Sequence, residues 1–135
     1  QLSLKTFNDP LTGLANRALF MERLTHAVHR ASRTKETLGV MVVDIDNFKV
    51  VNDSLGHFAG DALIQEVAHR LDACVRETET LARVGGDEFT ILFESLAGES
   101  AALAVAERIQ EALAIPIEID GNKVLVTASM GLTLN

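Results

Sequence analysis

Two pairs of acidic residues stand where strands are expected to end. Asp44 and Asp46 follow a short apolar run, and Asp87 and Glu88 follow a pair of glycines in a predicted turn. If the strands before them are neighbours in one sheet, these carboxylates converge on one edge and form an oxygen-rich pocket. Such a pocket suits Mg²⁺, which binds a few carboxylates together with phosphate oxygens and water. Two ions there can activate an attacking hydroxyl and stabilise the leaving pyrophosphate of an in-line displacement.

Each acidic pair also has a purely structural interpretation, because acidic residues often end strands and Gly-Asp is common in turns. The two pairs together favour a metal site. Gly85 and Gly86 add to this hypothesis, since residues without a Cβ let the backbone approach a ligand closely.

The charge of the chain limits the classes of ligand. The net charge is −7 and the 12 basic residues are scattered, which argues against a nucleic-acid surface. A single anionic nucleotide would need divalent cations between its phosphates and the protein carboxylates.

The length of 135 residues, 47% of them hydrophobic, predicts one globular domain. Cys74 is the only cysteine, which excludes an internal disulfide and favours a reducing compartment. No apolar run is long enough to span a bilayer. We therefore expect a cytoplasmic domain without direct membrane contact, in a parent protein with or without its own anchor.

Apolar residues spaced three and four apart predict three helices. The first begins after Asn16, a suitable N-cap, and the second follows a polar turn region that comes after residues 44–49 and runs through Gly60. Asp61 would then lie in the first turn of the second helix, where a negative side chain suits the helix dipole. The apolar residues that define the three helices are Leu19, Phe20, Leu24, Ala27, Val28 and Ala31; Leu63, Val67, Leu71, Cys74 and Val75; and Leu103, Ala106, Ile109 and Leu113.

The strands are predicted from apolar runs and turn residues. The continuous run at 38–44 indicates a strand covered on both faces in the middle of a sheet. Runs at 80–84 and 89–93 flank the glycine pair as a hairpin, and alternation at 115–119 and 124–130 predicts a second hairpin. The order of elements predicts an α+β fold, an α/β sandwich in which helices flank a largely antiparallel central sheet.

Four segments resemble, in order and in spacing, the signature blocks of GGDEF domains, the diguanylate cyclase family. They are residues 9–17 (DPLTGLANR), 44–53 (DIDNFKVVND), 56–61 (GHFAGD) and 83–89 (RVGGDEF). Residues 126–131 resemble a later strand of the family. The resemblance extends over essentially the whole chain.

The resemblance implies a sheet similar to the palm of polymerases and class III nucleotide cyclases. It implies a cyclase that joins two GTP molecules into cyclic di-GMP with release of pyrophosphate. Each domain would hold one GTP, and two domains would meet as a homodimer so that each 3′-hydroxyl attacks the α-phosphate of the other substrate.

The resemblance also assigns roles at the acidic residues. Asp44, the backbone carbonyl of Ile45 and Asp87 would hold Mg²⁺ or Mn²⁺, two ions per GTP. Asp87 or Glu88 would help to deprotonate the attacking hydroxyl. Gly85 and Gly86 would lie against the substrate.

Five further residues receive substrate-binding roles from the resemblance. Asn52 and Asp61 would read the guanine edge, because a carboxylate accepts from N1–H and the 2-amino group, and adenine would leave it unpaired. Lys49 either neutralises phosphate charge in the transition state or is a solvated lysine. Phe48 either faces the triphosphate with its N–H or packs in the core, and His57 either contacts substrate or packs the loop.

One departure from the family lies at residues 76–79. Many members carry an inhibitory product site written Arg-x-x-Asp before the glycine pair, and here Arg76 is followed by Glu79. The longer carboxylate puts feedback inhibition by cyclic di-GMP in question, and an exposed charge cluster at a helix end is the alternative.

A second departure lies after residue 131, where the family continues with another helix and strand that bear phosphate-binding basic residues. We therefore expect residues 1–135 to be a C-terminally incomplete GGDEF domain of a larger protein, fused to sensory domains. The residues around Arg83 and at 120–122 also resemble family members in which this domain precedes a cyclic di-GMP phosphodiesterase (EAL) domain. The alternative function is accordingly a catalytically silent domain that binds GTP or cyclic di-GMP and controls such a partner.

Overall fold

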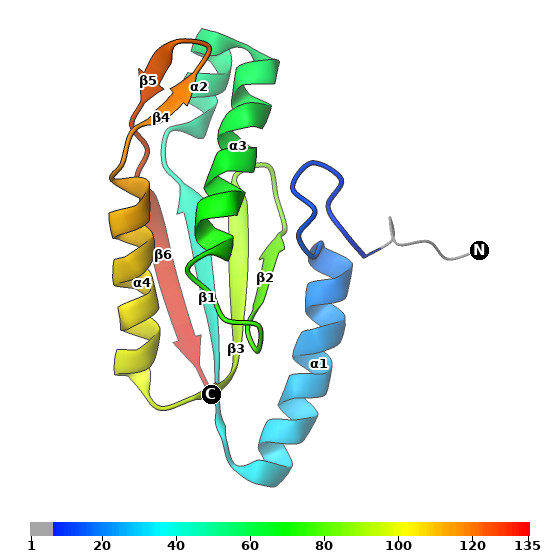
Figure 1. The fold of residues 1–135 in the computed structure, drawn as a ribbon. Coiled ribbons are helices and arrows are strands. Elements are labelled where there is room, and N and C mark those ends of the chain that lie inside the picture. The colour runs from blue at the N-terminus through cyan, green and yellow to red at the C-terminus, as the bar shows by residue number, and fades with distance from the viewer. Residues whose placement is uncertain (1–6) are drawn as a thin grey trace, which may run out of the picture.

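The computed structural model describes residues 7–135, which form four helices and six strands (Figure 1). Their bounds are α1 Arg17–Thr34, β1 Thr37–Ile45, α2 Phe48–Leu55, α3 His57–Asp72, β2 Thr80–Arg83, β3 Glu88–Leu96, α4 Glu99–Leu113, β4 Ile117–Ile119, β5 Asn122–Val124 and β6 Ala128–Leu134.

The main sheet has four strands in the order β2-β3-β1-β6, and every pair of neighbours is antiparallel. β1 is therefore a central strand, as its continuous apolar run predicted. The β2–β3 hairpin around the glycine pair is also confirmed, with Arg83 opposite Phe89 at its closed end.

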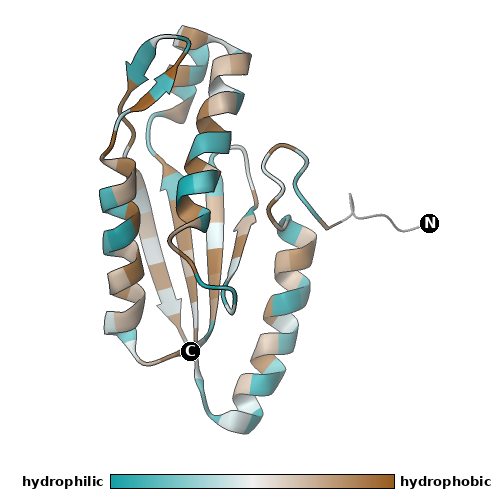
Figure 2. Ribbon diagram, viewed as in Figure 1, coloured by the Kyte–Doolittle hydropathy of each residue, from teal (hydrophilic) through white to brown (hydrophobic). Residues whose placement is uncertain are grey.

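Helices cover both faces of this sheet (Figure 1). α3 and α4 lie side by side on one face, where they bury the larger apolar core with β1 and β3. α1 packs on the other face against β1, β2 and β3 in a smaller core. Apolar and polar residues alternate along the helices in Figure 2, and the buried apolar residues of α3 and α4 belong to the larger core. The predicted α+β fold class is thus confirmed.

The predicted polar turn between β1 and the second helix is wrong, because α2 and the first turn of α3 occupy it. Phe48, Val51 and Leu55 are three and four residues apart, and the first two pack on the larger core. Polar residues between them concealed this short apolar face. Asp61 consequently lies beyond the first turn of α3, so helix capping does not explain it.

The second hairpin also differs from the prediction. β4 and β5 form a separate two-stranded sheet, and β6 belongs to the main sheet instead of prolonging β5. The alternation of apolar residues continues from β5 into β6. Alternation alone therefore does not reveal where the chain leaves the small sheet for the main sheet.

Of the helices within residues 7–135, none is both long enough and apolar enough to cross a membrane.

Candidate metal and nucleotide site

The end of β1 places one carboxylate directly opposite another. Asp44 pairs in register with Glu88 of β3, and the adjacent Ile45 N–H donates to the Asp87 carbonyl at 3.0 Å. Asp44 and Glu88 therefore form a non-hydrogen-bonded pair of the antiparallel ladder. In such pairs the Cα atoms are typically ~4.5 Å apart and the two side chains lie on the same face of the sheet. One carboxylate of each acidic pair thus lies at the same end of the sheet, as the sequence predicted.

This register distinguishes the two acidic residues of the turn. Glu88 is the cross-strand neighbour of Asp44, whereas Asp87 precedes β3 and contacts β1 through its carbonyl. Within the described chain, no three His, Cys, Asp or Glu side chains gather closely enough to hold a metal. The donor set fits Mg²⁺, which commonly takes one or two carboxylates and completes its shell with phosphate oxygens and water.

Asp46 is already engaged in hydrogen bonds within the protein. Its carboxylate accepts from the Thr127 hydroxyl at 2.8 Å and the Ser129 hydroxyl at 2.7 Å, and its N–H donates to the Thr127 carbonyl. The bonds from Ser129 and Thr127 lower the pKa of Asp46 below its usual value. Asp46 therefore fastens the end of β1 to β6, while the exposed Asp44 two residues earlier is available to a ligand.

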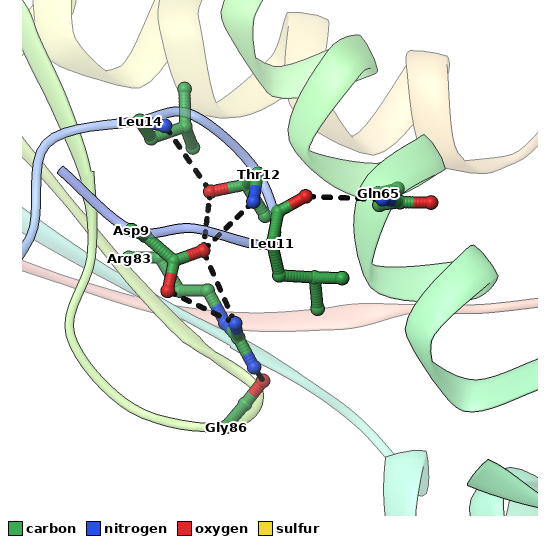
Figure 3. A network of polar contacts seen from close by, with 7 residues as sticks. All are labelled: Asp9, Leu11, Thr12, Leu14, Gln65, Arg83 and Gly86. Atoms are coloured by element: carbon green, nitrogen blue, oxygen red, sulfur yellow. Dashed lines mark hydrogen bonds and ion pairs between the residues drawn. The ribbon is translucent and has the colours of Figure 1, made fainter. Parts of the chain in front are cut away.

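An arginine supports the turn that carries Asp87 and Glu88 (Figure 3). The Arg83 guanidinium donates to the Gly86 carbonyl at 2.9 Å and pairs with Asp9 of the N-terminal loop at 3.2 Å. Both side chains of this ion pair are only 16% exposed. The N-terminal loop thus braces the acidic turn from a position 74 residues away in the sequence.

Asp9 is also bonded to its own loop. It accepts from the Thr12 N–H at 2.9 Å and from the Thr12 hydroxyl at 2.7 Å. Burial raises the pKa of Asp9, but the Thr12 bonds and Arg83 outweigh burial, so the pKa lies below its usual value. Asp9 and Arg83 were missed as site residues, although both lie in signature segments, because a pairing across this distance has no local signal.

The two glycines of the turn are not required by the backbone. Neither Gly85 nor Gly86 has a positive φ. A Cβ at Gly86 would meet nothing within 4 Å, and a Cβ at Gly85 would meet only Glu88 at ordinary contact distance. Local structure therefore does not require glycine at either position.

The helical hairpin α2–α3 places the predicted guanine reader Asn52 against Gly60, the residue before the other predicted reader, Asp61. Asn52 lies against Gly60 on α3, and its Nδ2 is 3.4 Å from Nδ1 of His57. Asp61, which is exposed, follows Gly60 directly. Of the alternatives for His57, the structure places its ring beside Asn52.

The first turn of α2 carries the two remaining substrate-binding candidates. Phe48 packs on the larger core, as one of its two interpretations predicted. Its N–H belongs to the first turn of a helix, where N–H groups lack partners within the helix. Lys49 is exposed, and the ion pairs found in the described residues do not include it.

Arg76 and Glu79 lie beyond the opposite end of β2 from the acidic turn. The Glu79 carboxylate accepts the Arg76 N–H at 2.9 Å, and the Glu79 N–H donates to the Arg76 carbonyl at 3.0 Å. Both residues line surface hollows of about 360 and 370 Å³. The Glu79 carboxylate therefore closes a tight turn. A ligand that binds this carboxylate would have to share its oxygen with the Arg76 N–H.

Comparison with known proteins agrees with this geometry. Residues 6–135 match the family described as "Diguanylate cyclase, GGDEF domain". Diguanylate cyclase TpbB of Pseudomonas aeruginosa (strain UCBPP-PA14) is 40% identical over 134 residues, which are 98% of this chain and 31% of that protein. Cyclic di-GMP phosphodiesterase PdeR of Escherichia coli (strain K12) is 38% identical over 135 residues, 100% of this chain and 20% of that protein.

A solved structure of the isolated GGDEF domain of TpbB from Pseudomonas aeruginosa superposes with a TM-score of 0.91 at 41% identity. The match covers 94% of this chain and 74% of that one. The chain spans about a third or less of the length of the two full-length relatives.

Proposed function

Because this chain belongs to the GGDEF domain family of diguanylate cyclases, we propose that it condenses two GTP molecules into cyclic di-GMP and releases pyrophosphate. The observation that carries the proposal is the register that sets Asp44 opposite Glu88, beside a glycine pair that local structure does not require. These features offer carboxylates and an accessible backbone where a triphosphate and its cations would lie.

The carboxylates are the proposed ligands of Mg²⁺ or Mn²⁺. Asp44 and the Ile45 carbonyl contribute from β1, Glu88 is the partner that the register favours, and Asp87 is the one that the family resemblance implies. Metal ions bound there would neutralise phosphate charge and lower the pKa of the attacking hydroxyl. The carboxylate of Asp87 or Glu88 that is not a ligand accepts the proton of that 3′-hydroxyl.

The helical residues of the site bind and orient the substrate. Asn52 and Asp61 hydrogen-bond the guanine edge, beside His57, and Asp61 discriminates against adenine because its carboxylate would lose its donors. Lys49 and the N–H of Phe48, both in the first turn of α2, face the phosphates.

Each domain holds one GTP, so the reaction needs two copies that meet as a homodimer with their sites facing. Sensory domains in the same polypeptide would control this encounter in the cytoplasm. The experiment that tests the function is incubation of the full-length protein with GTP and Mg²⁺, followed by chromatography for cyclic di-GMP and an assay for pyrophosphate. Absence of both products from a dimeric protein that binds GTP contradicts the cyclase proposal.

A second candidate is a regulatory domain that binds GTP without turnover and controls a fused phosphodiesterase. The relative that favours this candidate is PdeR, which is named a phosphodiesterase and matches all of the present chain. Stimulation of cyclic di-GMP hydrolysis by GTP in the full-length protein, without synthesis, supports this candidate over the first.

We also propose that Arg76 and Glu79 form a weakened inhibitory product site. The Arg76 guanidinium remains accessible, but the Glu79 carboxylate already accepts the Arg76 N–H. Cyclic di-GMP should therefore inhibit synthesis more strongly in Glu79→Asp than in the natural sequence. Inhibition of equal strength in both, abolished by Arg76→Ala, contradicts the weakening.

A further inference from the structure

Gly60 is a glycine that its own backbone does not need. It lies in the first turns of α3, is buried, and has no positive φ. Glycine is the least favourable residue in a helix interior apart from proline, because its backbone loses the most freedom on ordering. A requirement from outside the helix must therefore explain this residue.

That requirement is the side chain of Asn52. A Cβ built on Gly60 would collide with the Asn52 Oδ1 atom and would lie 3.0 Å from its Cγ. The next neighbour is the Phe48 ring at 3.4 Å, an ordinary contact. The amide of Asn52 thus occupies the space that any other residue at position 60 would fill with its own Cβ.

The far side of the same amide is also held by α3. Nδ2 of Asn52 lies 3.4 Å from the ring of His57, one turn before Gly60. Asp61, the other proposed guanine reader, is the residue that follows Gly60. The helix that carries Asp61 therefore also holds the side chain of Asn52, at Gly60 and at His57.

We propose that Gly60 is the positioning residue for guanine recognition: the space left by its missing Cβ seats the Asn52 amide beside Asp61. This inference rests on the proposed function in taking Asn52 as a guanine reader. Gly60 itself touches no substrate in this account and acts through Asn52 alone.

The substitution Gly60→Ala tests the proposal without threatening the fold. Alanine favours the helix, and the atom it displaces is the free end of a side chain that can rotate away. Binding of α,β-methylene-GTP, which cannot release pyrophosphate, should weaken roughly 10- to 100-fold in calorimetry with Mg²⁺. Binding of α,β-methylene-ATP should change little, so the preference for guanine falls. The matched control is Gly131→Ala on β6, where a Cβ meets nothing within 4 Å.

A double-mutant cycle separates action through Asn52 from any direct effect. In an Asn52→Ala background the obstructing amide is gone, so Gly60→Ala should cost no further affinity. A full additional loss in that background would mean that the backbone at Gly60 itself meets the nucleotide, and would overturn the proposal.

Side-chain amide NMR gives a readout that does not depend on nucleotide binding. The Asn52 amide protons should show distinct, ordered signals in the natural protein and lose them in Gly60→Ala, while Gly131→Ala leaves them unchanged. If the natural protein binds no GTP analogue, the proposed function fails while this measurement still decides the seating of Asn52. Unchanged Asn52 signals in Gly60→Ala would overturn the inference.

Discussion

The two ends of the site are held in place by different interactions. At the proposed metal end, Asp44 lies opposite Glu88 because the backbones of β1 and β3 are in register. At the proposed guanine end, Asn52 packs against α3 in the space where Gly60 lacks a Cβ. A backbone ladder keeps its residues in place when neighbouring side chains change, whereas a seat formed by side-chain packing does not. Substitutions should therefore act at the metal end mainly through the ligands themselves, and at the guanine end also through their neighbours.

The largest effect is expected at Asp44. Asp44→Asn removes a proposed charged metal ligand from an exposed position and should lower cyclic di-GMP synthesis roughly 1,000-fold, as loss of metal-based charge stabilisation implies. The melting temperature should stay unchanged, because the carboxylate has no structural partner among the hydrogen bonds of the described residues. Chromatographic assay of product and thermal denaturation measure the two quantities.

Asp46→Asn is the matched control for Asp44→Asn, two residues along the same strand end. Because Asp46 accepts hydroxyl bonds from Thr127 and Ser129, its loss should lower the melting temperature and affect synthesis less. The reverse pattern, with Asp46 essential for turnover and Asp44 dispensable, would refute the assignment of Asp44.

The next effect separates the two acidic residues of the turn. If the register decides the ligand, Glu88→Gln should raise the Mg²⁺ concentration for half-maximal synthesis about tenfold, the effect of one lost charged ligand interaction. Asp87→Asn should leave that concentration nearly constant while lowering the maximal rate. A Mg²⁺ titration of both variants is sufficient, and a shift confined to Asp87→Asn would restore Asp87 as the partner of Asp44.

A smaller effect is expected at the brace between the N-terminal loop and the turn. Arg83→Met frees the Gly86 carbonyl and leaves Asp9 without its cation, so synthesis should fall about tenfold as the turn loses its position. The synthesis rate of Arg83→Lys should lie between those of Arg83→Met and the natural protein, because lysine keeps the charge but not the forked geometry. Steady-state kinetics should show the loss in kcat more than in KM, and a pure stability loss with normal kcat would contradict a positioning role.

The smallest effect concerns acid stability. The pKa of Asp9 is lowered in the folded protein, so the Asp9 carboxylate stabilises the folded state. This stabilisation is complete above the ordinary pKa of about 4 and is lost as the pH falls through the lower pKa of the folded protein. Asp9→Asn should cost about 1 kcal/mol of unfolding free energy at pH 7 and progressively less below pH ~4. Urea denaturation at several pH values measures this, and a constant difference between the variants would exclude the carboxylate as its source.

Local patterns predicted much of the fold. The uninterrupted apolar run of β1 identified a central strand, the glycine pair identified the β2–β3 hairpin, and Asn16 does accept the Leu19 N–H as the N-cap of α1. Prediction failed where the apolar pattern was short, or where it fitted more than one face of a helix. α2 was hidden among polar residues, and Leu103, expected on the buried face of α4, is 49% exposed. Its neighbours Ala102 and Val105 carry that face instead.

The sequence by itself determined the residue types of the site and their positions in signature segments. Chemical type and local turn preference are properties of neighbouring residues, so Asp44, Asp87 and Glu88 stood out without a structure. The assignment of Asp61 to the first turn of a helix failed because it depended on where a helix began.

Only the tertiary structure decided which of these groups face one another. Strand register set Glu88 opposite Asp44, and the hydroxyls of β6 engaged Asp46. Packing of α2 on α3 turned Gly60 into the seat of Asn52. These relations join residues that are distant in the chain or on different elements, and their energy comes from contacts that exist only once the strands pair and the helices pack.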